Sequence, residues 1–287
     1  MNRFAKITAL AAISAISLTA CGVNGDKGSS SASSSKTTST ASSAAQPSDS
    51  SADAVSFKPA CPGGSISGAG SSAQLNAINQ VISDYKAACS SATVNYSPTG
   101  SGAGVKSFIG RQTDWAGSDS VLNADKGEPD KAKQRCNADP WHLPMAAGPI
   151  AVVYNVDGVK DLTLSTATLA KIFSGAITNW NDDAIKKENP KAALPSAQIE
   201  VFYRKDESGT TDNFQRFLEN SAPADWPYEH SKEFAPKGVG SGASKSTGVG
   251  DTVSKTPGSI TYVEWGFATE NDLGVAQIDF GAGPVTL

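Results

Sequence analysis

The chain has 287 residues, with 24 lysines and arginines against 28 aspartates and glutamates and a formal net charge of −4. A net acidic chain argues against nucleic acid and anionic lipid as binding partners, because both are polyanions. If the protein binds an anion, it must do so through local dipoles and individual charges.

The N-terminus has the features of a secretory signal (1–20), in which a short basic segment precedes an apolar run too short for a comfortable membrane span. The run ends in Leu-Thr-Ala-Cys, which looks like a bacterial lipobox, so we expect cleavage before Cys21 and lipidation of its thiol. An ordinary signal with a coincidental cysteine is the alternative. Residues 21–58 are rich in Ser, Ala and Thr, which predicts a disordered tether. The protein would then be extracytoplasmic and lipid-anchored to the outer face of the cell membrane.

Three further cysteines, Cys61, Cys89 and Cys136, match no zinc-ligand spacing, so we expect no metal site. An exported chain can form disulfides. Cys61 precedes the first strand-like segment and Cys89 precedes the second. Parallel strands joined by a helix begin at the same end of a sheet, which favours a Cys61–Cys89 bridge. A Cys89–Cys136 bridge remains an open alternative.

After residue 60 the chain alternates strand-like and helix-like segments. The strand-like segments are 65–70, 93–97, 114–119, 198–204 and 259–265. Apolar residues at helical spacing occur at 75–85, 105–109, 169–173 and 214–218. A long apolar stretch, 142–155, is interrupted by Pro144 and Pro149. This alternation predicts an α/β fold with mainly parallel sheets.

Three loops share one design of small residues, a hydroxyl and a helix start: GAGSS (68–72), TGSGAG (99–104) and DESGTT (206–211). In open α/β sheets such loops gather at the carboxyl ends of the strands, where helix N–H groups can bind an anion. Arg204 and Asp206 lie at the last of these loops. The alternative is that its hydroxyls only cap the helix, and that the two charges form an exposed pair.

Patterns typical of enzymes are weak. The sequence Gly68-x-Gly70-x-x-Ala73 fits a loose dinucleotide fingerprint without the acidic residue expected about 20 positions later. No Walker lysine and no G-x-S-x-G elbow is present, and His142 and His230 are the only candidate triad bases. We therefore expect a binding protein without a cofactor and not an enzyme.

Four motifs in this order, TGSGAGVKSF, DWAGSD, IFSGAITNW and RKDESGTTDNF, make the chain resemble a known family. It resembles the phosphate-binding lipoproteins (PstS) of the bacterial ABC phosphate importer, in their actinobacterial form, from about residue 65 to 285. The resemblance implies a two-lobed, type II periplasmic-binding-protein-like fold with a hinge near 145–149. Lobe 1 would be 59–146, and 147–287 would form the hinge and lobe 2.

The resemblance also implies the ligand and its contacts. The phosphate-binding residues would be Ser72, Ala73, Ser101, Asp119, Arg204, Ser208, Gly209 and Thr210. Asp119 would accept the ligand's proton, Arg204 would make the charged contact, and Asp206 would hold Arg204 in place. The partners would be ABC permease subunits and their ATPase, with no nucleic acid. Another oxyanion such as sulfate, or an exported phosphatase or other hydrolase, is the alternative.

The chain departs from the family pattern in two ways. Ala73 stands where some members carry a bulkier residue, which is tolerable because its contact would be made by the backbone. The family usually continues for several dozen residues beyond the position of Leu287, and those residues complete the first lobe. We therefore expect an incomplete first lobe, and a partner for Cys136 in the missing part. A fragment, a prematurely ended gene and a real short variant all fit this expectation.

Overall fold

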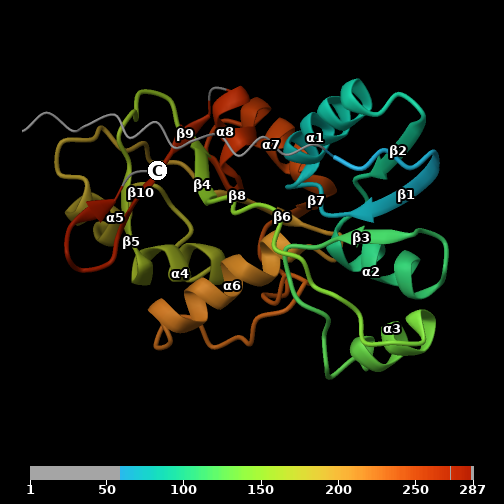
Figure 1. Ribbon diagram of the computed structural model, residues 1–287. Helices are drawn as coiled ribbons and strands as arrows, with labels where there is room; N and C mark the ends of the chain where they lie inside the picture. Colours follow the sequence, from blue (N-terminus) through green and yellow to red (C-terminus); the bar gives the residue numbers. More distant parts are fainter. Residues whose placement is uncertain (1–58, 272, 286–287) are drawn as a thin grey trace, which may run out of the picture. The chain divides into compact units, whose positions relative to one another are not determined.

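The computed structural model describes residues 59–271 and 273–285 (Figure 1). The predicted signal peptide, the lipidation site at Cys21 and the tether up to residue 58 lie outside these residues. Within the described part, no helix has both the length and the apolar character that a membrane span requires.

The first sheet, here called the β1 sheet, has the strand order β2-β1-β3 and is parallel throughout. Its elements are β1 (Gly64–Gly70), α1 (Leu75–Ala88), β2 (Ala92–Ser97), α2 (Ser101–Ile109), β3 (Trp115–Gly117) and, after it, α3 (Glu128–Cys136). Helix α2 packs on β1 and β3, and α1 packs on β2. No residue of α1 is buried, and Val81 on this helix and Ile66 in β1 are 57% and 48% exposed.

The second sheet, here called the β6 sheet, has the order β7-β6-β8-β4-β9. Its strands are β4 (Ile150–Asn155), β6 (Glu200–Arg204), β7 (Ser241–Ala243), β8 (Ser259–Glu264) and β9 (Gly274–Val275). Strand β6 is parallel to β7 and β8, whereas β4 is antiparallel to β8 and β9.

Helices cover both faces of the β6 sheet. They are α4 (Thr166–Ser174), α6 (Gly209–Ser221), α7 (Lys245–Lys255) and α8 (Trp265–Glu270). Strand β4 is apolar on both faces, because Val152 and Tyr154 point into one core and Ala151 and Val153 into the other. Figure 1 shows α4 and α6 on one side of this sheet and α7 and α8 on the other.

A small third sheet has the order β11-β10-β5. It consists of β5 (Thr163–Ser165), β10 (Gln277–Asp279) and β11 (Pro284–Val285), and α5 (Asp183–Glu188) packs against β5. Leu162 and Leu164 beside and within β5 are fully buried in the larger of the two cores.

The α/β prediction is confirmed, and five of the eight strand pairings among the described strands are parallel. The apolar stretch 142–155 behaves differently from a single strand, since only Ile150–Asn155 joins a sheet. Upstream of it, Trp141 and Met145 are 88% and 78% exposed in irregular backbone. Prolines in this segment remove backbone donors and explain why no strand extends there.

Candidate anion-binding site

Strand-to-helix connections from both large sheets meet at one place. The connection after β1 leads to α1, that after β2 to α2, that after β6 to α6, and that after β7 to α7. Contacts between them are direct: Ser72 lies against Ser246, and a Cβ added to Gly209 would lie 2.7 Å from both Ser101 Oγ and the Cβ of Asp119. The structure therefore brings the three predicted loops together and adds a fourth.

Arg204 ends strand β6 and is only 2% exposed. Its Nε donates to Asp206 Oδ1 at 2.8 Å, and its Nη2 forms a short hydrogen bond and ion pair with Asp206 Oδ2. Its Nη1 donates to Ser246 Oγ at 3.4 Å. These bonds use three of the five guanidinium N–H groups, so two remain for a ligand.

Asp206 is built to keep its charge. Burial alone would raise the pKa of Asp206, but the hydrogen bonds and charge of Arg204 hold this pKa below its ordinary value. The amide of Lys245 also donates to Asp206 Oδ1 at 2.9 Å. A carboxylate fixed in this way locks the planar fork of Arg204 in one orientation.

The start of α6 presents further donors. Ser208 is the N-cap, and its hydroxyl accepts from Thr211 N at 3.2 Å. The amides of Gly209 and Thr210 lie in the first turn, where no carbonyl of the helix can accept from them. The hydroxyl of Thr210, a residue that is 3% exposed, is buried without a hydrogen-bond partner in the described part of the chain. Buried hydroxyls are usually paired, so this one is a donor that a ligand could use.

Behind this turn a buried tyrosine supports both α6 and β6. The hydroxyl of Tyr262 lies 2.8 Å from Thr211 Oγ1 and accepts from the amide of Arg204 at 3.4 Å. Burial raises the pKa of Tyr262 to about 12, so this hydroxyl stays neutral. It is therefore a fixed support and not a group that titrates.

Asp119 follows β3 and faces donors from the β1 sheet. Its Oδ2 accepts from Ser71 Oγ at 2.6 Å and from Ser101 Oγ at 3.4 Å, and its Oδ1 accepts from Gln74 Nε2 at 2.9 Å. From the other side, Asn213 Nδ2 donates to the backbone carbonyl of Asp119 at 2.7 Å. The carboxylate is thus anchored at the meeting point of the two sheets.

The predicted residues differ in whether their donor groups already form hydrogen bonds within the protein. The amide of Ala73 donates to Ser71 Oγ at 3.1 Å, and the amide of Ser208 donates to the carbonyl of Lys232 at 2.8 Å. Neither amide is uncommitted in this structure. The hydroxyl of Ser101 is engaged with Asp119. By contrast, Arg204 and Thr210 retain donors that these hydrogen bonds do not use.

Three residues of the site were missed from the sequence: Ser71, Gln74 and Ser246. The segment around Ser246, SGASKSTG (241–248), has the same design of small residues, hydroxyls and a helix start as the three predicted loops. This sequence pattern is only a weak indication of a strand and a helix, because β7 has only three residues and α7 carries few apolar side chains. Ser71 and Gln74 flank predicted ligand residues and act by holding Asp119.

The predicted Cys61–Cys89 disulfide is confirmed, with its Cα atoms 5.1 Å apart. The open alternative, Cys89–Cys136, is therefore wrong, and Cys136 carries no disulfide within the described residues. The bridge ties the segment before β1 to the end of α1. The part of the chain that the structure describes holds no group of three or more His, Cys, Asp or Glu residues suited to a metal ion.

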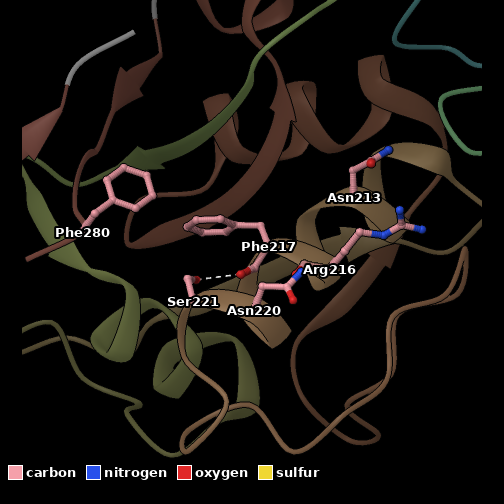
Figure 2. A pocket seen from close by; sticks show the side chains of 6 residues that line it. All are labelled: Asn213, Arg216, Phe217, Asn220, Ser221 and Phe280. Carbon is pink, nitrogen blue, oxygen red and sulfur yellow. Dashed lines mark hydrogen bonds between the residues drawn. The ribbon is translucent and has the colours of Figure 1, made fainter.

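A separate hollow of about 440 Å³ lies along α6. Figure 2 shows the side chains that line it. It is lined by Asn213, Arg216, Phe217, Asn220, Ser221 and Phe280. The rings of Phe217 and Phe280 meet edge to face at 5.8 Å, and Ser221 Oγ donates to the carbonyl of Phe217. None of its lining side chains has a buried polar atom without a partner, so it lacks the features of the anion site.

Comparison with known proteins gives the family to which this fold and this candidate site belong. The profile of the PBP superfamily domain matches residues 30–286, and the chain belongs to this family. The type II periplasmic-binding-protein-like fold and the resemblance to phosphate-binding proteins are thereby confirmed.

Two relatives and one solved structure illustrate the similarity. The chain is 44% identical over 238 residues to phosphate-binding protein PstS2 of Mycobacterium bovis, covering 83% of this chain and 64% of that protein. It is 46% identical over 219 residues to phosphate-binding protein PstS 3 of Mycobacterium leprae, covering 76% and 58%. A phosphate ABC transporter substrate-binding protein of Clostridium perfringens, solved with bound phosphate, superposes with a TM-score of 0.58 at 21% identity, covering 76% of each chain, and this likeness concerns the fold. The chain thus spans less than two thirds of the length of these two mycobacterial relatives.

Proposed function

We propose that this chain is an extracytoplasmic substrate-binding protein that captures inorganic phosphate for an ABC importer. The observation that carries the proposal is a set of buried donors that the hydrogen bonds of the described structure leave unused at neighbouring positions of the chain: the hydroxyl of Thr210 and two N–H groups of Arg204. A tetrahedral oxyanion offers acceptors in several directions at once, and helix N-termini with an arginine are suited to it. The names of the mycobacterial relatives support phosphate as the oxyanion.

In this proposal the ligand contacts the eight predicted residues. These are Ser72, Ala73, Ser101, Asp119, Arg204, Ser208, Gly209 and Thr210. Arg204 supplies the positive charge, and Asp206 holds its guanidinium group in place. Asp119 accepts the proton that phosphate carries near neutral pH. Sulfate has no such proton and would face an unpaired carboxylate, so the site favours phosphate.

The remaining predictions complete the proposal. Lobe 1 is 59–146, and 147–287 forms the hinge, near 145–149, and lobe 2. Lipidation of Cys21 anchors the protein to the outer face of the membrane. Permease subunits and their ATPase receive the phosphate.

Binding is favoured over hydrolysis by the surroundings of the two histidines. His230 Nδ1 lies 2.6 Å from Glu219 Oε2, and His142 is exposed in irregular backbone. Neither forms a hydrogen bond with a serine in the described structure. A hydrolase serine would need such a base within hydrogen-bond reach.

The test is calorimetric titration of the protein with phosphate and, separately, with sulfate. We expect one phosphate bound per chain, much weaker sulfate binding, and no turnover of a chromogenic phosphate ester. Thr210→Val should weaken phosphate binding by about 10-fold, because the variant keeps the side-chain shape but loses the hydroxyl. Thr269→Val, at an exposed threonine of α8, is the matched control. Absence of phosphate binding, or an unchanged affinity in Thr210→Val, would contradict the proposal.

A further inference from the structure

Ser246 joins the two halves of the site although no predicted loop includes it. It is the second residue of α7 and is 1% exposed. Its amide donates to Ser72 Oγ at 3.0 Å, and the two serine Oγ atoms lie 3.1 Å apart. Its Oγ also accepts from Arg204 Nη1 at 3.4 Å. The side chain of Ser246 thus contacts both Arg204, at the end of β6, and the hydroxyl of Ser72, which follows β1.

The directions of these hydrogen bonds follow from what each group can do. An arginine and a backbone amide only donate, so the hydroxyl of Ser246 accepts from Arg204. A hydroxyl that accepts from a cation is polarised and becomes a better donor. The Oγ of Ser72 is the acceptor within its reach, at 3.1 Å. Either hydroxyl could donate across this contact, and polarisation by Arg204 favours Ser246 as the donor to Ser72.

The consequence concerns the proton of Ser72. Its Oγ then accepts twice, from the amide and from the hydroxyl of Ser246, which occupies both lone pairs. Its own proton must be donated outward. Ser72 and Ser246 are both buried, which limits the access of bulk water to this proton. With Ser246 as the donor, the orientation of the Ser72 hydroxyl is set before a ligand arrives.

We propose that Ser246 is a positioning residue that commits the Ser72 hydroxyl to donating, so that this part of the site accepts an oxygen atom without a proton. The inference rests on the proposed capture of phosphate and deepens it. The series of hydrogen bonds from Arg204 through Ser246 to Ser72 transmits the polarising effect of the arginine to the connection after β1. Ser246 acts through Ser72 and does not need to contact the ligand itself.

The experiment is a double-mutant cycle read by calorimetric titration with inorganic phosphate. The proteins are wild type, Ser246→Ala, Ser72→Ala and the double variant. We expect Ser246→Ala to weaken binding by about 10- to 150-fold, the usual range for a lost hydrogen bond that involves a charged partner. In the Ser72→Ala background the same change should have little further effect, since its target is already gone.

Controls separate positioning from disturbance of the fold. Ser244→Ala alters an exposed serine two residues away, whose side chain makes no capping hydrogen bond, and should leave affinity unchanged. The unfolding midpoint of ligand-free Ser246→Ala should stay close to that of wild type. Wild-type affinity in Ser246→Ala, or the same loss with and without Ser72, would overturn the inference. Absence of phosphate binding by the wild-type protein would instead contradict the proposed function.

Discussion

At the scale of single residues, the site depends on a contact between two residues that are close in the sequence. Arg204 and Asp206 are two positions apart, at the end of a strand, and their side chains meet through two hydrogen bonds. The exposed-pair alternative is wrong, because the Arg204 side chain is 2% and that of Asp206 19% exposed. The partner of Arg204 on the other side, Ser246, is 42 residues away, and the pattern around it is too weak to indicate this contact.

We expect Arg204→Ala to lower phosphate affinity strongly and Arg204→Lys to lower it less. Removing one partner of a buried charge contact costs about 2–5 kcal/mol, whereas lysine keeps the charge and loses only the planar fork. Calorimetric titration measures both. Arg216→Ala is the control, since Arg216 lies on α6 with a side chain 46% exposed and its contact to Asp212 is long, at 3.9 Å. Phosphate affinity like that of wild type in Arg204→Ala would remove this residue from the site.

At the scale of elements, the helices and strands that could be predicted are those with a clear local sequence pattern. The start of α6 was expected from Ser-Gly-Thr, and Ser208 is indeed its N-cap. Helix α7 was missed because Val249 and Val253 are its only large buried apolar residues, too few for a clear helical period. The antiparallel placement of β4 could not be foreseen either, because a strand that is apolar on both faces fits either direction. Register and partner choice come from packing between distant segments.

Gly209 is the element-scale test of how closely α6 approaches the β1 sheet. A Cβ at this position would lie 2.7 Å from the Cβ of Asp119 and 2.9 Å from its amide. We expect Gly209→Ala to weaken phosphate binding by roughly 5- to 150-fold, the equivalent of about 1–3 kcal/mol of overpacking. Alanine is favoured over glycine in helices by about 1 kcal/mol, so the unfolding midpoint of the ligand-free protein should fall by less than the overpacking alone would cause.

The matched control is Gly250→Ala on α7, where an added Cβ meets nothing within 4 Å. It should leave phosphate affinity unchanged in the same titration. Equal affinities of Gly209→Ala and Gly250→Ala would show that the start of α6 does not need its close contact with Asp119 to bind the ligand.

At the scale of the whole described unit, the two large sheets are held together by charges as well as by the site. Glu207, in the loop after β6, pairs with Lys106 on α2 at 2.7 Å, and its carbonyl accepts from Gly102 N at 2.9 Å. Burial would raise the pKa of Glu207, but Lys106 and Lys126 keep this pKa below its ordinary value. A second pair is buried: Lys232 Nζ lies 3.4 Å from Glu128 Oε2 on α3, with side chains 7% and 9% exposed. The backbone of Lys232 also accepts from Ser208, so this pair is tied to the start of α6.

The two pairs should differ in their contribution to stability. Lys232→Met leaves the carboxylate of Glu128 buried without its cation, which costs about 3–5 kcal/mol of unfolding free energy. Lys106→Met removes a cation whose side chain is 67% exposed, and such surface pairs contribute about 0–1 kcal/mol. Urea unfolding of both variants measures the difference, with Lys232→Met and Glu128→Gln combined as the control, because neutralising the carboxylate should restore much of the loss. If Lys232→Met unfolds at the same urea concentration as Lys106→Met, the buried pair does not hold α3 to the loops of the β6 sheet.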